Sequence, residues 1–426
     1  MKEHSHTPHL ITAMVGPLQT LERKILAKEK EIEKWFAAQW KQSPAPVYGS
    51  VDLRNAGFKL APVDMNLFPA GFNNLNTAFM SFTIEAARNA IITAVPNAKK
   101  VLLLPENHTR NIFYWESVAV ILKIIKGAGF EVKIGSINPE VTEPFSISLP
   151  SGVEVNVSPA EREKDILKVG NFVPDVILLN NDLSAGIPSL LTQLSQPVMP
   201  PAQLGWSQRL KSEHFQYYSN VSKEFANFID IDDWVMSPLF RKCGEVDFMQ
   251  REPDDCLTKN VAELFAEIEK KYAEYNITEK PFIIVKADAG TYGMAVMTVR
   301  SVEELQNLNR KQRTAMSKTK SGQPVTQVIV QEGVYTFETI GDSNAVAEPV
   351  VYLWGEQVVG GFYRVHKDRE VDENLNSPGM HFEPLPFAKS CHTPNEKDEC
   401  QNRFYSYGVI ARLSMLAAAR EMLEQK

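Results

Sequence analysis

The chain has 426 residues, of which 44% are hydrophobic and 23% are charged, and its formal net charge is -7. This length suffices for two or three domains, and the composition is that of a globular protein with a sizeable core. The negative charge argues against a broad nucleic-acid-binding surface. No apolar run is long enough to predict a transmembrane helix, and the N-terminal segment MKEHSHTPHL lacks the apolar region of a signal peptide.

Cysteines and histidines show no zinc-binding spacing. The chain has four cysteines: Cys243, Cys256, Cys391 and Cys400. They form no C-x-x-C pair and are too few for a disulfide framework, so we interpret all four as incidental to the chemistry and expect a reducing, cytoplasmic location. Three histidines, His4, His6 and His9, lie near the N-terminus. They favour a mobile polar tail over a metal site.

The N-terminal half predicts a helix and a hairpin, followed by alternating helices and strands. Apolar residues recur at helical spacing in residues 18–40, and residues 48–67 read as a hairpin that turns at residues 55–57. The alternation that follows predicts a parallel sheet. Its expected helices are 83–95 and 110–126, and its expected strands are 101–104, 131–135 and 175–180. The proline-rich residues 198–203 predict a linker.

The C-terminal half predicts an amphipathic helix, several strands and a closing helix. A capping box at Ser301 and Glu304 predicts a helix that continues to about Arg313. The other expected helices are 258–275 and 404–424, and the expected strands are 282–285, 295–299, 328–331, 349–354 and 358–365.

Residues 281–299, PFIIVKADAGTYGMAVMTV, are the most informative segment. An apolar strand ends in Lys286, and a loop with Gly290 and Gly293 leads into a second strand. Glycines let backbone N–H groups approach phosphate oxygens, and the lysine supplies a positive charge. In a Walker loop the lysine follows the glycines instead. The segment predicts a flexible lid over a triphosphate; the alternative is an ordinary hairpin with a surface lysine.

Residues 328–334, VIVQEGV, extend this nucleotide site. They predict an apolar strand that runs into a small-residue hinge, where backbone groups can pair with an adenine edge. The candidate adenine-binding residues are Gln331, Glu332 and Val334. The alternative is a core strand that ends at a glycine turn.

Two further basic residues are candidates for the phosphate groups. Residues 348–379 predict two strands that flank Gly355, and the second strand carries Arg364. An arginine beside a nucleotide site can neutralise charge on a transferring phosphoryl group. Lys211, in the segment GWSQRLKSEHF, is a candidate second ATP lysine. The alternatives are a surface strand arginine and an exposed helix lysine.

The hairpin near the N-terminus carries candidate metal ligands. Asp64 and Asn66 are two residues apart on one strand and therefore share a face, and Asp52 lies on the partner strand. Oxygen ligands of this kind suit Mg²⁺. The alternative is a set of ordinary polar hairpin residues.

Taken together, these segments resemble the ATP-grasp superfamily. IIVKADAGTYGMAV is similar to the lysine strand and glycine loop of bacterial glutathione synthetases, and VIVQEGV is similar to their adenine hinge. VVYLWGEQVVGGFYRV followed by ENLNSPGMHFEPL is similar to their strand pair, arginine and substrate loop. Over its whole length the chain resembles the short bacterial glutamate–cysteine ligase family, through VDLRNAGFKLAPVDMNLFPAGFNNL, NNDLSAGIP and GWSQRLKSEHF.

The resemblance has one departure, which concerns the metal hairpin. ATP-grasp enzymes usually end with a hairpin that carries the metal ligands, whereas this chain ends on a predicted helix and has the similar pattern at residues 52–72. The resemblance therefore implies a circularly permuted α/β ATP-grasp fold. Residues 76–200 would form a parallel-sheet domain, residues 201–426 the ATP-grasp body and lid, and residues 1–75 would complete that body.

The reaction implied by the resemblance joins L-glutamate to L-cysteine with ATP and Mg²⁺, giving γ-glutamylcysteine through an acyl phosphate. Lys211 and Lys286 would hold phosphates, and Arg364 would stabilise the transferred charge. The implied contacts to the amino acids are Arg54, Asn73, Asn374 and Asn376. If the hairpin did not reach the site, metal ligands would have to come from Glu348, Asp372 or Glu373. Another ATP-grasp carboxylate–amine ligase, or an inactive nucleotide-binding module, stays open as an alternative.

Overall fold

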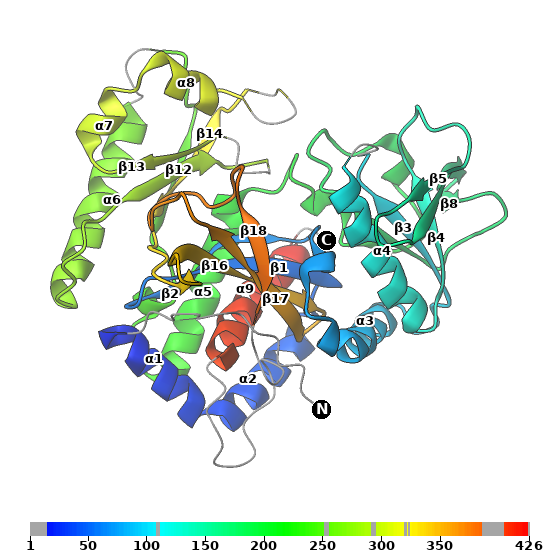
Figure 1. Ribbon diagram of the computed structural model, residues 1–426, viewed down its shortest axis with the longest axis horizontal. Coiled ribbons are helices and arrows are strands. Elements are labelled where there is room, and N and C mark those ends of the chain that lie inside the picture. Colours follow the sequence, from blue (N-terminus) through cyan, green and yellow to red (C-terminus); the bar gives the residue numbers. More distant parts are fainter. Residues whose placement is uncertain are drawn as a thin grey trace.

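The structure is a computed structural model. It describes residues 15–107, 111–250, 255–290, 295–318, 322, 324–385 and 404–424. Figure 1 shows three lobes: a central sheet backed by helices, an α/β lobe that includes α3 and α4, and a smaller lobe that includes β12, β14 and α6. The predicted α/β fold class is confirmed.

The central sheet brings together segments from both ends of the chain. Its strands are β1 (Tyr48–Asn55), β2 (Leu60–Asn66), β15 (Thr339–Ile340), β16 (Ala345–Trp354), β17 (Gln357–His366) and β18 (His381–Pro384). The strand order is β18-β17-β16-β1-β2, with β15 paired to β16, and all pairs are antiparallel. The N-terminal hairpin thus joins the sheet that carries Arg364, which is the arrangement that a circular permutation requires.

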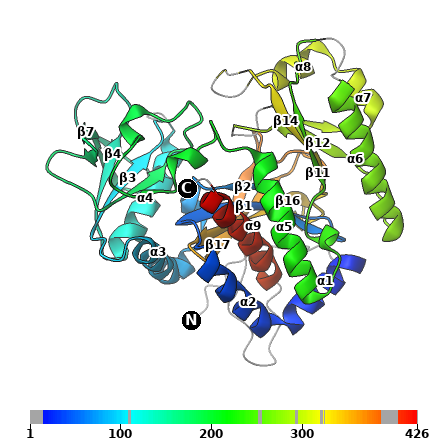
Figure 2. The same ribbon diagram turned by 180° about the vertical axis from the view of Figure 1, so that it is seen from behind.

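Four helices cover one side of this sheet: α1 (Gly16–Ala27), α2 (Glu29–Gln42), α5 (Lys211–Ile229) and α9 (Phe404–Glu424). Seen from behind in Figure 2, α5 and α9 lie side by side, and α9 packs on β1, β2 and β16. Residues 18–40 were predicted as one helix, but the backbone leaves helical geometry at Lys28 (φ -113°, ψ 20°), which divides them into α1 and α2.

The α/β lobe contains the predicted parallel sheet. Its elements are α3 (Met80–Ala94), β3 (Lys100–Pro105), α4 (Ile112–Gly127), β4 (Glu131–Ser136), β5 (Phe145–Ser148), β6 (Glu154–Pro159), β9 (Val176–Asn180) and β10 (Val198–Met199). Strands β10, β9, β3, β4 and β6 are parallel, and β5 adds an antiparallel edge. A separate small hairpin consists of β7 (Glu161–Glu163) and β8 (Ile166–Lys168).

The smaller lobe contains the strands that flank the glycine loop. Its strands are β11 (Phe240–Gly244), β12 (Ile283–Ala287), β13 (Val296–Val299) and β14 (Gln327–Glu332), in the order β11-β14-β12-β13. Its helices are α6 (Asp255–Glu274), α7 (Val302–Gln306) and α8 (Arg310–Met316). Short 3-10 helices occur at Phe72–Asn74, Thr77–Phe79, Ser189–Leu191, Ala202–Leu204 and Asp233–Val235.

Several sequence predictions need correction. Residues 198–203 were predicted as a linker, but Val198 and Met199 form β10, which pairs with β9 at the edge of the sheet. The helix predicted from Ser301 to Arg313 is two helices, because Asn309 caps a new helix with its own capping box. Strands β5–β8, β11, β15 and β18 were not predicted. None of the helices in the described residues is long and apolar enough to cross a membrane.

Candidate active site

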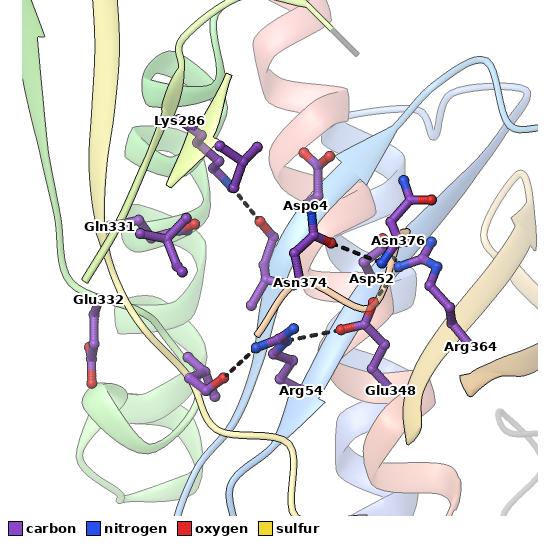
Figure 3. Close-up of a pocket in the computed structure, with 14 residues that line it drawn as sticks. Asp52, Arg54, Asp64, Lys286, Gln331, Glu332, Glu348, Arg364, Asn374 and Asn376 are labelled. Atoms are coloured by element: carbon purple, nitrogen blue, oxygen red, sulfur yellow. Dashed lines mark hydrogen bonds and ion pairs between the residues drawn. The ribbon is translucent and has the colours of Figure 1, made fainter. Parts of the chain in front are cut away.

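A pocket lies where the central sheet meets the sheet of the smaller lobe (Figure 3). It is lined by Asp52, Arg54, Val63, Asp64, Ile284, Lys286, Val296, Gln331, Glu332, Val334, Glu348, Arg364, Asn374 and Asn376. Ten of the fifteen candidate site residues named from the sequence are in this set. The other five are considered individually below: Asn66, Asn73, Lys211, Gly290 and Gly293, the last of which lies outside the described residues.

Two carboxylates face each other at the base of the pocket. Asp52 on β1 is directly opposite Asp64 on β2, next to a bulge between Asp52 and Leu53. Like charges in directly opposite positions of an antiparallel pair repel each other. The pair is therefore favourable only when cations lie beside it, and the structure supplies them from three elements.

Arg364 on β17 binds the first carboxylate. Its Nη1 lies 3.0 Å from Asp52 Oδ2 and also donates to Glu348 Oε1 on β16. Burial raises the pKa of Asp52, an effect that Arg364 opposes and that Glu348 and Asp64 reinforce. Burial also acts to raise the pKa of Glu348, but Arg54 and Arg364 outweigh it and keep that pKa low. Glu348 is thus an ionised bridge between two arginines.

Two lysines bind the second strand. Lys211 Nζ lies 3.1 Å from Asp64 Oδ1, and Lys286 Nζ donates to Val63 O at 2.7 Å. Burial acts to raise the pKa of Asp64, but Lys211 and Lys286 outweigh it and hold the pKa well below its usual range. Burial lowers the pKa of Lys286 to about 8. Lys211 does not line the pocket itself but reaches its base through Asp64.

Asp288 joins the elements that carry the two lysines. Its backbone carbonyl accepts from Lys211 N at 2.8 Å, and its carboxylate accepts from Ser212 N and Ser212 Oγ, both at 2.7 Å. The side chain is fully buried. Because Asp288 follows Lys286 by two residues, this contact fixes the end of β12 against the first turn of α5.

Gly290 lies two residues after Asp288, with φ +104°, a conformation that favours glycine. Gly293 lies outside the described residues.

The opposite wall of the pocket is apolar. Ile284, Val296 and Val334 line it, and Gln331 contributes a side-chain amide whose nitrogen has no hydrogen-bond partner among the described residues. A buried donor without a partner is costly. A flat ring with an acceptor nitrogen, such as adenine, would satisfy it, so this wall fits a nucleotide base.

Part of the expected hinge is already hydrogen-bonded within the protein. The Glu332 carboxylate points into the core, where it accepts from Lys59 Nζ at 2.7 Å and from Trp234 Nε1 at 3.1 Å. Its backbone N–H donates to Leu239 O, and that of Gly333 donates to Phe282 O. These groups are already used within the protein. The Gln331 side chain is therefore a better candidate for base recognition than Glu332.

The candidate amino-acid contacts fall into two groups. Asn374 and Asn376 line the pocket, and Asn374 Oδ1 accepts from Asn376 N at 2.9 Å. Arg54 also lines it, but its three nitrogens bind Glu348 Oε2, Val334 O and Glu373 O. Arg54 therefore fixes the surrounding loops. Asn73 is exposed and does not line this pocket.

The remaining metal candidates are not equivalent. Asn66 Oδ1 accepts from Phe68 N at 2.9 Å, which keeps this side chain in a local turn outside the pocket lining. Of the alternative ligands, only Glu348 lines the pocket; Asp372 pairs with Arg300. In the described ranges, no three His, Cys, Asp or Glu side chains are placed to hold a metal ion by themselves. Two carboxylates still suit Mg²⁺, which is commonly bound by one or two carboxylates together with substrate phosphates.

Glu348 and Asp288 are the site residues that sequence reasoning undervalued. Glu348 was considered only as a substitute ligand, although it lies directly opposite Arg364 across the β16–β17 hairpin. Asp288 lies within the glycine-loop segment, and its position two residues after Lys286 was the available signal. The histidines at positions 4, 6 and 9 and the cysteines Cys391 and Cys400 lie outside the described residues.

A family model and one solved structure indicate the same family. The glutamate-cysteine ligase family matches residues 22–422. A solved structure from Methylobacillus flagellatus KT, which carries the provisional name gamma-glutamylcysteine synthetase, is 53% identical. The match covers 98% of this chain and 99% of that chain, with a TM-score of 0.90. The comparison with curated proteins finds no match.

Two more distant structures are also similar. One is D-alanyl-alanine synthetase A from Vibrio cholerae O1 biovar eltor str. N16961, with 13% identity over 74% of this chain and 81% of that chain and a TM-score of 0.34. The other is a glutathione synthetase-like effector from Globodera pallida, with 8% identity over 86% and 79% and a TM-score of 0.37. These scores are too low to carry an argument. The family match over nearly the whole chain is decisive: this chain belongs to the glutamate-cysteine ligase family.

Proposed function

We propose that this protein uses ATP and Mg²⁺ to join the γ-carboxylate of L-glutamate to the amine of L-cysteine, giving γ-glutamylcysteine, ADP and phosphate. The observation that carries the proposal is the pocket itself. In a chain of this family, it brings two facing carboxylates, Lys286 and Arg364 together beside an apolar wall. Such a pocket suits a triphosphate at one end and an anionic acceptor at the other.

ATP would lie between the two sheets. The wall formed by Ile284, Val296 and Val334 would cover the faces of the adenine, and the Gln331 amide would donate to its edge. Lys286 and Lys211 would move from Val63 O and Asp64 to phosphate oxygens. Charge-assisted hydrogen bonds of this kind are among the strongest in proteins.

Asp52 and Asp64 would hold Mg²⁺, and the ion would supply charge neutralisation between the phosphates. Arg364 already carries its positive charge beside Asp52; burial acts to lower its pKa, but Asp52 and Glu348 outweigh this effect and raise the pKa. It would therefore remain charged while stabilising the phosphoryl group in transfer. Asn374 and Asn376, at the rim of the pocket, would contact the amino-acid substrates.

The chemistry would proceed in two steps. The glutamate γ-carboxylate oxygen attacks the γ-phosphorus of ATP, which forms an acyl phosphate and releases ADP. The cysteine amine then attacks the acyl carbon and releases phosphate, with loss of one amine proton. No enzyme nucleophile is needed, because the substrate itself carries the activation. The cysteine thiol of the substrate takes no part.

Product identification by mass tests the proposal directly. The protein is incubated with ATP, Mg²⁺ and mixed amino acids, and ADP release is followed in parallel. We expect a product with the mass of γ-glutamylcysteine, and ADP release that requires both glutamate and cysteine. A different amide product would instead indicate another carboxylate–amine ligase. Absence of ADP release with every amino acid would indicate a nucleotide-binding module.

A further inference from the structure

β2 is the outer strand of the central sheet, so one of its edges has no neighbouring strand among the described elements. Side-chain cations bind the carbonyls along this edge instead. Val63 O accepts from Lys286 Nζ at 2.7 Å, and Met65 O accepts from Arg209 Nη1 at 3.0 Å. These two carbonyls flank Asp64. The backbone on both sides of this carboxylate is therefore fixed by positive charges.

The two contacts differ in how easily they can be broken. Lys286 makes a single hydrogen bond to β2, and in the proposed function it moves to a phosphate. Arg209 has a second set of contacts besides the one to β2. Its Nε and Nη2 bind Glu421 Oε1 and Oε2 at 2.8 and 2.9 Å. Both side chains of this bidentate pair are only 1% exposed. Arg209 would thus keep its contact with Met65 when the lysines leave.

The surroundings of Arg209 explain its fixed orientation. Its Nη2 lies 3.0 Å from His214 Nδ1, and His214 Nε2 lies 3.2 Å from Ser414 Oγ. His214 Nδ1 also lies 3.4 Å from Glu421 Oε2, so the imidazole contacts both members of the ion pair. The arginine therefore has partners on α5 and α9, and among the described residues its hydrogen bonds to the central sheet go to Met65 alone.

We propose that Arg209, oriented by Glu421 of helix α9, is a positioning residue that holds β2 in place and thereby keeps Asp64 opposite Asp52 for metal binding. This inference rests on the proposed function and extends it to residues outside the pocket. Outer-shell contacts of this kind commonly orient the groups that bind a metal. Here the contact acts through the backbone of the neighbouring residue.

A double substitution tests the role without leaving a buried charge. Arg209→Met with Glu421→Leu removes both charges and keeps apolar volume, a replacement that proteins often tolerate. It leaves Met65 O without its donor. Mn²⁺ binding in the presence of ADP is followed by the electron paramagnetic resonance of free Mn²⁺, and the Mg²⁺ dependence of ADP release is measured separately. We expect Mn²⁺ affinity to fall by about tenfold or more, the size typical of lost outer-shell contacts.

The chain offers a matched control on the same helix. Arg412 of α9 makes a bidentate pair with Glu33 of α2, at 2.8 and 2.7 Å, and the Arg412 side chain is 2% exposed. Arg412→Met with Glu33→Leu removes a similar pair away from β2. Thermal unfolding then separates a loss of stability from a loss of metal affinity, because we expect the control to keep wild-type Mn²⁺ affinity whatever its stability.

The outcomes are distinct. Unchanged Mn²⁺ affinity in the folded Arg209→Met/Glu421→Leu protein, or an equal loss in the control, overturns the inference. If the double variant does not fold, the Mn²⁺ affinity of Arg209→Lys is measured instead. A lysine cannot bind Glu421 through two nitrogens and still reach Met65 O, so the inference requires a loss of affinity in this variant too. If the wild-type protein makes no γ-glutamylcysteine but Mn²⁺ binding still depends on Arg209, the proposed function fails and the positioning role stands.

Discussion

Asp52 and Arg364 are 312 residues apart in the sequence, yet Arg364 Nη1 lies 3.0 Å from Asp52 Oδ2. The contact exists because β1 pairs with β16, and β16 pairs with β17. The N-terminal hairpin therefore lies in the same sheet as the strands that follow the smaller lobe. This proximity gives the site its alternating carboxylates and cations, and it makes the roles of single residues open to test.

Lys286→Met should weaken ATP binding and leave the fold intact. The substitution keeps the length and apolar bulk that pack near Phe215, with Lys286 Nζ 5.4 Å from that ring, but it removes the charge. A hydrogen bond to a charged group contributes roughly 1.5–3 kcal/mol, so affinity should fall by roughly ten- to a hundredfold. Calorimetry measures the ATP affinity, and Lys259→Met, a substitution at an exposed position, is the control. Unchanged affinity in a folded Lys286→Met protein would remove this residue from the site.

Asp64→Asn should separate ATP binding from turnover. Asp64 now binds Lys211, so its neutralisation frees that lysine for phosphate, and ATP affinity should be largely retained. Turnover should nevertheless fall by about a hundredfold or more, as when a single charge-stabilising group is removed, because the metal bridging the phosphates is misplaced. Calorimetry and ADP release report the two effects. The exposed Asp230→Asn is the control; a turnover loss no larger than the control's contradicts a metal role.

Gln331→Met should change stability and ATP affinity in opposite directions. The buried Gln331 amide nitrogen has no partner in the described structure, and removing an unsatisfied buried donor relieves a penalty of about 1–3 kcal/mol. The free protein should therefore melt at the same or a higher temperature, while ATP loses the donor to its base. Thermal unfolding with and without ATP measures both effects. ATP affinity equal to that of the wild-type protein would show that Gln331 does not recognise the base.

Local sequence patterns predicted the main elements well where hydrophobic periodicity is strong. The hairpin, the alternating α/β lobe and helices α6 and α9 are present near their predicted positions. Element breaks were less predictable. Lys28 interrupts a helix whose hydrophobic periodicity reads as continuous. Asn309 interrupts another through a capping box with Gln312, a local signal that hydrophobic periodicity does not contain.

Register was the part of the site that sequence could not provide. From the turn at Gly355, the β16–β17 hairpin begins with Trp354 opposite Gln357, a register that would place Arg364 opposite Ala347. A bulge between Tyr352 and Leu353 moves the register by one residue, so Arg364 lies opposite Glu348 instead. A shift of one residue changes which side chains face each other. A bulge near Asp52 has the same effect on β1 and β2.

Replacing either described cysteine should change turnover by no more than a few fold. Cys243 Sγ lies 3.3 Å from Cys256 Sγ in the smaller lobe, and neither residue lines the pocket. The proposed mechanism uses the amine of substrate cysteine and needs no enzyme thiol. Cys243→Ala and Cys256→Ala are compared with the wild type by product formation, with circular dichroism to check folding. Loss of activity in a folded variant would indicate a catalytic thiol and contradict the mechanism.

Acid should destabilise the protein in part through Glu421. Burial acts to raise the pKa of Glu421, but Arg209 and His214 outweigh it and lower the pKa to about 2. In the unfolded chain a glutamate has a pKa of about 4.3. Between these values the unfolded state binds a proton that the native state does not. The stabilisation is therefore complete above about pH 5 and is lost as the pH falls toward 2.

His214 acts in the same direction at higher pH. Burial lowers its pKa, so as the pH falls through about 6.5 the unfolded ring gains a proton before the native ring does. The shift of Glu421 corresponds to a stabilisation on the order of 3 kcal/mol at neutral pH. Urea unfolding from pH 7 to pH 3 measures the loss. Other carboxylates also lose stabilisation in acid, so the wild type is compared with Arg209→Met/Glu421→Leu. The variant should lose less free energy of unfolding on acidification than the wild type. Parallel stability curves for the two proteins would show that this cluster does not contribute to acid sensitivity.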